Sequence, residues 1–347
     1  MLRRKWILTG IVLCEEPRRK NSMIGSHQYV ANRLIEDRVA HSILEAGKKR
    51  FQLITVMDGH GGFQVAEYMT AELPGLISQE INSGKPVQEA LKSAFLLADD
   101  RWFSLVQPAY KLGFTNPIKA GACAIAVVLD ETEITVASVG DCKCVLARSD
   151  GTVKDLNIDR NANKEEEQAR LRQLHPGEDD VVKCRRSWTE IVSNSVTKTF
   201  YSGCYVKGRL QPTKSFGDFH LKSSSVAHDP ERGTTFLNSA SNVSQPYIDA
   251  DPDLSVTRRD EHDLFLIAAT DGLWDQFSSE EAVKIVRKSL ESDGHTPEQA
   301  SQVLIEAALL KAADDRKISI SELKALPQGT ARRSVHDDIS VCIVLLR

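Results

Sequence analysis

Acidic residues stand beside apolar runs at several distant points in this chain of 347 residues. They are Asp58 after FQLITVM, Asp271 after DLFLIAAT, Asp337-Asp338 before ISVCIVLL, Asp141 in the turn Gly140-Asp141, and Glu36-Asp37 at the start of EDRVAHSIL. A carboxylate at the end of a buried strand lies at the rim of a sheet. Several carboxylates meeting there would raise one another's pKa values unless a cation neutralised them. The pattern therefore suggests a site for hard divalent cations, which prefer oxygen ligands.

Such a site has a definite chemistry. Two ions about 3.5–4 Å apart that share a carboxylate can activate a water and hold a phosphoryl oxygen. Each Asp taken alone is explained as well by a turn or a helix cap, because Asp-Gly is a common turn dipeptide. The spacing does not show that the residues converge, so both interpretations stay open at this point.

The elements that would carry these residues follow from hydropathy. Apolar runs predict strands, and apolar residues at helical spacing predict helices. The strands are expected at 51–57, 121–129, 133–139, 143–148, 263–270 and 339–346, and the helices at 64–81, 86–105, 164–174, 278–291 and 297–313. The three middle strands are expected to form an antiparallel meander, and 175–205 an irregular insertion. This order is no regular βαβ alternation, so we expect antiparallel sheets with helices outside them.

Composition narrows the class of protein. The net charge of −4 argues against a protein that binds nucleic acid through a basic surface. Seven cysteines without a CxxC pair argue against a disulfide scaffold or a structural zinc site. Four of them lie in apolar runs, where buried reduced thiols in an intracellular, cytoplasmic protein are expected, with nucleus and organelles left open: Cys123, Cys142, Cys144 and Cys342.

The N-terminal segment 1–20 is set apart from the domain expected at 21–347. Its basic start and the apolar run 6–14 outline either an edge strand or a weak targeting segment. The run is too short to span a membrane, which needs about 20 residues, so no transmembrane span is expected.

The motifs themselves resemble a known family. Val56–Gly62 reads VMDGHGG and is similar to the DGHGG signature of the metal-dependent Ser/Thr protein phosphatases (the PPM, or type-2C, family). Further blocks resemble the family in the same order: 33–38, 138–143, 214–218, 268–275 and 336–341. The likeness covers residues 25–347. It implies an α+β fold, a four-layer αββα sandwich of two antiparallel sheets, here with a flap at about 155–215.

The resemblance implies two metal ions, Mg²⁺ or Mn²⁺, and a weaker third position. Asp58 matches the carboxylate that bridges the two ions. The other matches are Asp271 and Asp337 for one ion, Glu36 and Asp37 near the second, partly through water, and Asp141 with Asp271 for the third. Gly59 would contribute its backbone carbonyl as a further ligand.

Two further residues match the reaction itself. His60 matches the general acid, and a histidine can protonate a leaving serine or threonine oxygen near neutral pH. The family places an arginine for the phosphate four residues before its Glu, where this chain has Asn32. Arg33 follows one residue later, and a local bulge would let it take the phosphate role.

Three other departures lie near the flap. Cys142-Lys143, Arg160-Asn161-Ala162 and Lys214 replace residues that are usual in the family. The segments 175–176 and 206–212 resemble the pyruvate dehydrogenase phosphatase branch, which does not fix a substrate.

We therefore expect a monomeric serine/threonine phosphatase that acts on phosphoproteins through a metal-activated water. The alternative is a pseudophosphatase that keeps the fold and regulates a partner, which the shifted Arg33 and the altered flap would favour. A nucleotide-dependent phosphotransferase finds no support, since the chain has no phosphate-binding GxxxxGK[ST] loop.

Overall fold

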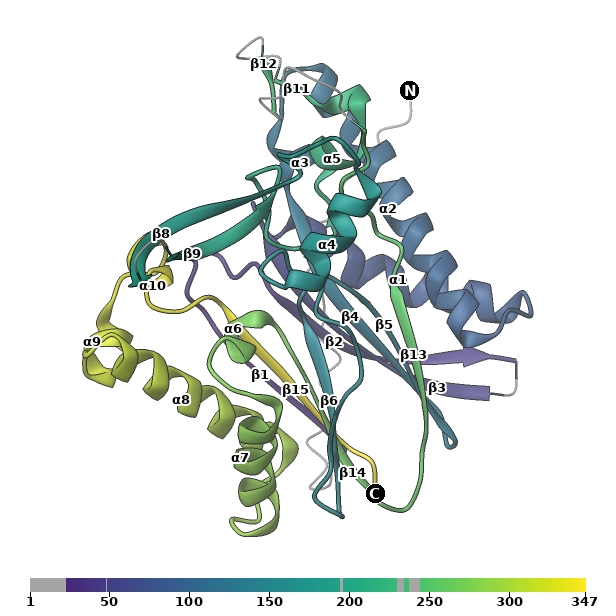
Figure 1. Ribbon diagram of the computed structural model, residues 1–347. Coiled ribbons are helices and arrows are strands. Elements are labelled where there is room, and N and C mark those ends of the chain that lie inside the picture. The colour runs from purple at the N-terminus through teal and green to yellow at the C-terminus, as the bar shows by residue number, and fades with distance from the viewer. Residues whose placement is uncertain (1–22, 48, 194–195, 230–233, 237–243) are drawn as a thin grey trace.

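Two antiparallel sheets form the centre of the protein in a computed structural model, which describes residues 23–47, 49–193, 196–229, 234–236 and 244–347 (Figure 1). The segment 1–20, expected to be an edge strand or a targeting segment, lies outside the described residues. The first sheet has the order β1 (Ile24–Tyr29), β15 (Ile339–Leu345), β14 (Asp263–Ala269), β6 (Lys143–Arg148) and β7 (Val153–Asp155). The second has the order β13 (Asp253–Arg258), β5 (Glu133–Val139), β4 (Gly121–Leu129), β3 (Lys49–His60) and β2 (Arg38–Ala46), with β10 (Phe216–Gly217) beside β4.

Helices cover the outer face of each sheet. Helices α1 (Gln64–Asn82) and α2 (Val87–Lys111) pack on the second sheet, and α7 (Ser279–Glu291) and α8 (Pro297–Asp315) on the first. The remaining described elements are short or lie in the flap and its surroundings: α3 (Asn116–Lys119), α4 (Glu165–Leu174), β8 (Val182–Ser193), β9 (Val196–Val206), α5 (Phe219–Lys222), η1 (Ser224–Val226), β11 (His228–Asp229), β12 (Thr234–Thr235), α6 (Asp271–Trp274), α9 (Ile320–Ala325) and α10 (Thr330–Arg333). The predicted α+β sandwich with helices outside two antiparallel sheets is confirmed.

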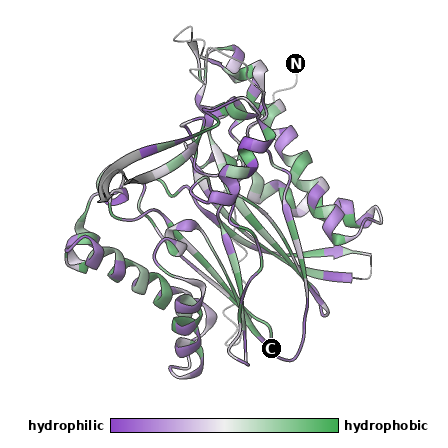
Figure 2. Ribbon diagram, in the orientation of Figure 1, coloured by the Kyte–Doolittle hydropathy of each residue, from purple (hydrophilic) through white to green (hydrophobic). Residues whose placement is uncertain are grey.

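Most strands are apolar on both faces, because helices cover one face of each sheet and the other sheet covers its second face. In β4 every residue is buried: the even-numbered alanines and Val128 face α1 and α2, while Cys123, Ile125 and Val127 face the other sheet. In β14 the same alternation directs Phe265 and Ile267 toward α7 and α8. Figure 2 shows hydrophobic residues along these strands and along the helix faces that pack on them. Continuous apolar runs were therefore reliable signals for the strands.

The predicted meander of three strands is wrong in its last step. Strand β5 pairs with β4 and with the edge strand β13, whereas β6 belongs to the other sheet and pairs with β14 and β7. The turn at Gly140-Asp141 is thus a crossing from one sheet to the other. Hydropathy cannot tell this crossing from a hairpin, because β6 is equally apolar in either sheet.

The insertion predicted to be irregular is also regular in part. Strands β8 and β9 pair as an antiparallel hairpin, and a disulfide joins Cys184 to Cys204 directly across it. Neither strand joins a large sheet, so the segment lacks the long apolar run on which the strand predictions depended. Four cysteines were expected to be buried free thiols, and this is confirmed for Cys123, Cys142, Cys144 and Cys342.

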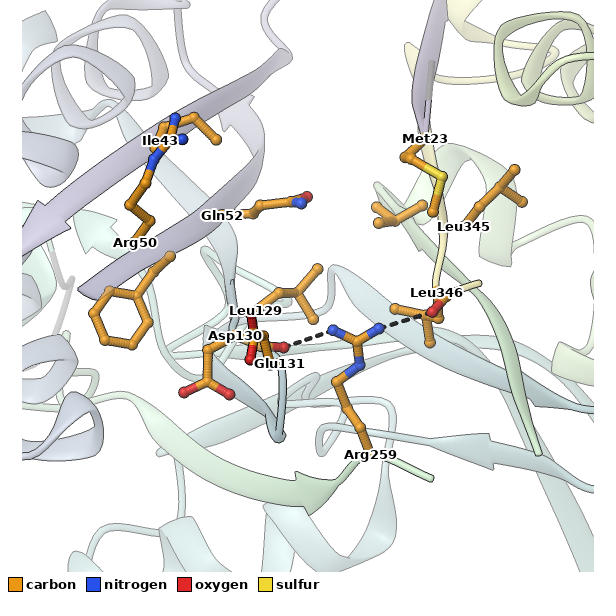
Figure 3. Close-up of a pocket in the computed structure, with 12 residues that line it drawn as sticks. Met23, Ile43, Arg50, Gln52, Leu129, Asp130, Glu131, Arg259, Leu345 and Leu346 are labelled. Carbon is orange, nitrogen blue, oxygen red and sulfur yellow. Dashed lines mark hydrogen bonds between the residues drawn. The ribbon is translucent and has the colours of Figure 1, made fainter. Parts of the chain in front are cut away.

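A groove of about 390 Å³ opens between the two sheets near the C-terminus of the chain (Figure 3). Met23, Ile43 and Leu345 contribute to its apolar lining. Arg259 spans its floor, donating hydrogen bonds to the carbonyl oxygens of Asp130, at 2.6 Å, and Leu346, at 2.8 Å. No helix in the described part of the chain has the length and apolar character needed to cross a membrane.

A pair of glycines tests how closely β1 packs on α8. A Cβ atom on Gly25 would lie 2.0 Å from the backbone nitrogen of Glu298, whereas one on Gly75, at an exposed position of α1, meets nothing within 4 Å. We expect Gly25→Ala to lower the free energy of unfolding by about 1–3 kcal/mol or more, because the backbones must separate. Gly75→Ala should raise it by about 0.5–1 kcal/mol. Urea denaturation measures both, and equal effects of the two variants would contradict the packing described.

Candidate active site

Three carboxylates from different parts of the chain meet at one edge of the sandwich. Oxygens of Asp58, Asp141 and Asp271 all lie within 4.8 Å of one another. Asp58 lies near the end of β3, Asp141 in the crossing from β5 to β6, and Asp271 at the start of α6 directly after β14. The convergence that the sequence left open is therefore present in the structure.

Burial and mutual repulsion set the charge state of this cluster. Burial raises the pKa values of Asp58, Asp141 and Asp271, and neighbouring carboxylates raise them further. The charge of Asp337 contributes at both Asp58 and Asp271. Oδ1 of Asp271 is buried and has no hydrogen-bond partner among the described residues. A hard divalent cation satisfies both conditions, since it neutralises the charges and takes carboxylate oxygens as ligands.

The acidic pair Glu36-Asp37 lies beside the cluster of Asp58, Asp141 and Asp271. Asp37 is 2% exposed, and its Oδ2 accepts a 2.9 Å hydrogen bond from the hydroxyl of Thr270, the residue before Asp271. Burial and nearby carboxylates raise the pKa of Asp37, and burial also raises that of Glu36. The pair thus belongs to the same negative region as the three clustered aspartates.

Asp338 fixes the chain that leads into this pair. Its carboxylate accepts hydrogen bonds from the backbone nitrogens of Ala31, Asn32 and Glu36 at 2.6, 3.0 and 2.9 Å. The side-chain nitrogen of Asn32 donates a further bond of 3.0 Å to it. Asp338 is a buried scaffold residue, a role that the sequence analysis did not give it.

The predicted ligands Asp337 and Gly59 lie at the border of the cluster. Oδ1 of Asp337 accepts from the backbone of Asp338 at 2.8 Å, and its Oδ2 from Arg333 at 3.0 Å. Gly59 lies so close under Glu36 that a Cβ atom there would be 2.4 Å from the Glu36 carbonyl oxygen. Both residues are in positions compatible with their predicted roles, which stay predictions.

His60 forms a dyad with Asp218. The Nε2 of His60 is 2.7 Å from Oδ2 of Asp218, which also accepts a 2.7 Å bond from the hydroxyl of Ser215. Burial opposes a charge on His60, but Asp218, with smaller contributions from Asp141 and Glu36, raises its pKa on balance. Despite its burial, Asp218 has a lowered pKa because His60 faces it. The histidine is thus held ready to carry a proton.

Gly121 leaves the space for this dyad. A Cβ atom on Gly121 would lie 2.0 Å from Oδ2 of Asp218 and 2.4 Å from Nε2 of His60. Gly121 pairs with His60 across β3 and β4 and with Gly217 of β10 on its other side. Apart from its place in a family block, nothing in the sequence points to Asp218 as the partner of His60, because 158 residues separate the two.

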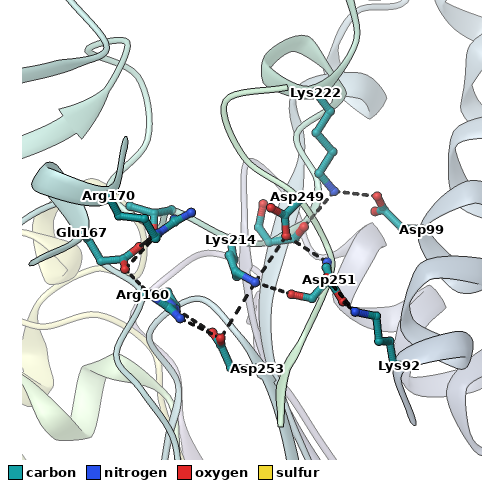
Figure 4. Close-up of polar contacts among 12 residues, drawn as sticks. Lys92, Asp99, Arg160, Glu167, Arg170, Lys214, Lys222, Asp249, Asp251 and Asp253 are labelled. Atoms are coloured by element: carbon teal, nitrogen blue, oxygen red, sulfur yellow. Dashed lines mark hydrogen bonds and ion pairs between the residues drawn. The ribbon is translucent and has the colours of Figure 1, made fainter. Parts of the chain in front are cut away.

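The cations near the flap are engaged in ion pairs (Figure 4). Arg160 donates two bonds of 2.6 and 2.7 Å to Asp253 and also pairs with Glu167. Nζ of Lys214 donates to the carbonyl oxygen of Asp251 at 2.5 Å, and the residue is 9% exposed. These residues secure the base of the flap against β13.

Arg33 lies in a groove beside the acidic cluster. The groove, of about 910 Å³, is lined on one side by Asn32, Arg33 and Glu36 and on the other by Thr330, Arg333 and Ser334. Arg33 is exposed, and its Cγ lies 3.3 Å from the point where a Cβ on Gly329 would stand. Its predicted contact with phosphate is not tested by this geometry.

Comparison with known proteins agrees with the geometry. A sequence profile described as protein phosphatase 2C matches residues 9–317. The probable protein phosphatase 2C 67 of Arabidopsis thaliana is 31% identical over 91% of this chain and 81% of its own. The probable protein phosphatase 2C 43 of Oryza sativa subsp. japonica is 28% identical over 91% and 75%.

Solved structures show the same fold. A serine-threonine phosphatase 2C from Toxoplasma gondii has a TM-score of 0.60 at 18% identity, over 93% of this chain and 94% of that one. A C. elegans sex determining protein has a TM-score of 0.61 at 17% identity, with 93% of this chain but 64% of that chain covered. Fold and site define a metal-dependent protein serine/threonine phosphatase. The chain belongs to the protein phosphatase 2C family.

The raised pKa values predict how metal and pH act together on stability. Without metal, the folded state holds protons that the unfolded state, with aspartates near the ordinary 3.8, has lost. The stability of the metal-free protein therefore falls as pH rises above about 4. Bound metal removes this penalty, so the rise in Tm on adding Mn²⁺ should be larger at pH 8 than at pH 5.5.

Thermal denaturation with EDTA and with Mn²⁺ at each pH measures this difference. Comparing the two conditions at one pH cancels the titration of groups remote from the site. An equal rise at both pH values would contradict the proton competition.

Proposed function

We propose that this phosphatase hydrolyses phosphoserine and phosphothreonine in proteins, by direct attack of an activated water and with His60 as general acid. The observation that carries the proposal is the dyad of His60 and Asp218 beside three converging carboxylates. Asp58 and His60 are two residues apart on β3, so both side chains are on the same face of the strand.

The acidic residues would hold Mg²⁺ or Mn²⁺ at two positions, with a third one weaker. Asp58, Asp271 and Asp337 are proposed for one ion, Glu36, Asp37 and the Gly59 carbonyl with Asp58 for the second, and Asp141 with Asp271 for the third. Bound there, the ions would supply the activation of water and the neutralisation of phosphoryl oxygens that this chemistry needs.

His60 would hold the proton that the leaving serine or threonine oxygen requires. An alkoxide is a poor leaving group, so a positioned acid lowers the barrier. Asp218 is a positioning residue, because it orients the imidazole and stabilises its protonated form. Gly217, next to it, donates its backbone N–H to buried Asp99 at 2.8 Å, which fixes the loop.

The pseudophosphatase alternative has weaker support. Every carboxylate position expected for the metals is occupied by Asp or Glu, and the carboxylates of three of them converge. The monomeric state and the cytoplasmic location stay predictions.

Replacing Asp58 tests the proposal most directly. Asp58→Asn removes the charge shared by the ions, and we expect turnover of a phosphothreonine peptide with Mn²⁺ to fall at least about 10²-fold. Asp293→Asn, at an exposed position just after α7, is the matched control and should retain wild-type turnover. EDTA should abolish wild-type activity. A folded Asp58→Asn enzyme with wild-type turnover would refute the assignment.

The dyad makes a separate prediction about pH. Asp218 raises the pKa of His60, so Asp218→Asn lowers it, and His60 loses its proton at a lower pH. The alkaline limb of the kcat profile should therefore move to lower pH. NMR titration of the His60 ring in the metal-loaded protein should show the same direction. A limb that stays in place or moves up would exclude His60 as the acid that Asp218 positions.

A further inference from the structure

The phosphate site lacks a cation at the position where the family resemblance places one. Asn32 occupies that position, and its side-chain nitrogen is committed to Oδ2 of Asp338 at 3.0 Å and to Oε2 of Glu36 at 3.4 Å. Asn32 is therefore part of the scaffold and carries no charge. Transfer of a phosphoryl group needs positive charge on its outer oxygens, so another residue should supply it.

Arg333 of α10 reaches the cluster from the opposite wall of the groove. Its Nη2 is 3.0 Å from Oδ2 of Asp337, and its Nη1 is 3.6 Å from Oε2 of Glu36. Burial raises the pKa of Glu36, and the charge of Arg333 opposes that rise. Its side chain is 45% exposed. A guanidinium has five N–H donors, so donors remain for a ligand in the groove.

The neighbouring Arg332, in contrast to Arg333, has a structural role. Its guanidinium donates to the carbonyl oxygens of Val30, Lys324 and Leu326 at 3.0, 3.0 and 2.7 Å. Together with the 2.8 Å bond from Gly329 N to Ala31 O, these contacts fasten the segment before β15 to the segment that leads to Glu36. Arg333 follows directly on this fastened segment, so its position relative to Glu36 is fixed.

Other cations around the cluster are held elsewhere. Lys143 lies over the Trp274 ring and near Asp155 and Ser279, while Arg160 and Lys214 secure the flap. Arg33 lines the same groove, with its side chain against Gly329. Among these described residues, Arg333 is the one whose guanidinium contacts carboxylates next to the cluster, those of Glu36 and Asp337.

We propose that Arg333, brought in by α10, binds the phosphoryl group of the substrate in place of the arginine missing at position 32. The inference rests on the proposed function, and it assigns to Arg333 the role expected of Arg33. When phosphate enters, the guanidinium exchanges contacts with Glu36 and Asp337 for paired hydrogen bonds to two phosphate oxygens, a geometry that arginine favours.

The experiment uses the full chain loaded with Mn²⁺, and inorganic phosphate is the ligand whose binding is measured. Arg333→Gln should weaken phosphate binding, measured by calorimetry, at least about 10-fold and lower kcat/KM for a phosphothreonine peptide about 10²-fold. Arg333→Lys keeps the positive charge but loses the paired donors of the guanidinium. Its phosphate affinity and its kcat/KM should lie between those of Arg333→Gln and wild type. Lys284→Gln, an exposed lysine of α7, controls for the loss of one positive charge and should change neither value.

Two outcomes would overturn the inference. In one, Arg333→Gln changes Mn²⁺ affinity but leaves phosphate binding intact, so that Arg333 only balances the acidic residues. In the other, Arg33→Gln causes the loss and Arg333→Gln does not. Circular dichroism checks the folding of each variant, and the milder Arg333→Lys supplies the test if Arg333→Gln does not fold.

The phosphate measurement also separates this inference from the proposed function. A wild-type protein that binds phosphate through Arg333 without turning over peptide would support the inference and refute the catalytic proposal. Turnover that depends on Asp58 and His60 but not on Arg333 would do the reverse.

Discussion

Mutual repulsion among clustered carboxylates is the constraint on which the rest of this structure depends. Asp58, Asp141 and Asp271 come from three chain segments, and burial and their common charge raise the pKa of each. Nothing in the cluster itself favours bringing them together. The free-energy cost of this repulsion is offset by apolar burial between the sheets and under the helices. This packing fixes the strand ends whatever side chains stand there. Protonation or a bound cation relieves this repulsion, and the charge of Arg333 does so in part at Glu36.

A second constraint joins the two ends of the domain. Strand β1 pairs with β15, which brings the segment after β1 next to the segment before β15. Asp338 uses this proximity, accepting bonds from Ala31, Asn32 and Glu36 across more than 300 residues of sequence. Glu36 and Asp37 are therefore placed by the C-terminal strand as much as by their own neighbours. Asp338 and Asn32 form one hydrogen-bonded unit, which gives a structural reason for the Asn at position 32.

Much of the fold could be predicted because most strands are apolar on both faces. The bounds of β4, β5 and β6 agree with the predicted runs residue by residue, since a doubly covered strand ends where its apolar run ends. The crossing from β5 to β6 and the hairpin of β8 and β9 were missed for the opposite reason: pairing depends on the partner strand, which the local pattern does not contain. The edge strands β1 and β13 were missed as well, because their polar alternation leaves no apolar run.

The residues of the site also fall into those that the sequence predicts and those that it does not. Carboxylates at strand ends could be identified from single motifs, because their position follows from the strand that precedes or follows them. Asp218, Gly121 and Arg333 could not, because each acts through a contact with a distant segment.

This difference between the carboxylates and the other site residues follows from what holds each group in place. The clustered carboxylates sit next to the ends of deeply packed strands, where any shift would disturb both layers. The cations and the hydrogen-bond donors sit on short helices and loops at the rim, where a positive charge can be supplied from either wall of the same groove. A residue type lost at one rim position, as at Asn32, is therefore compatible with a complete site.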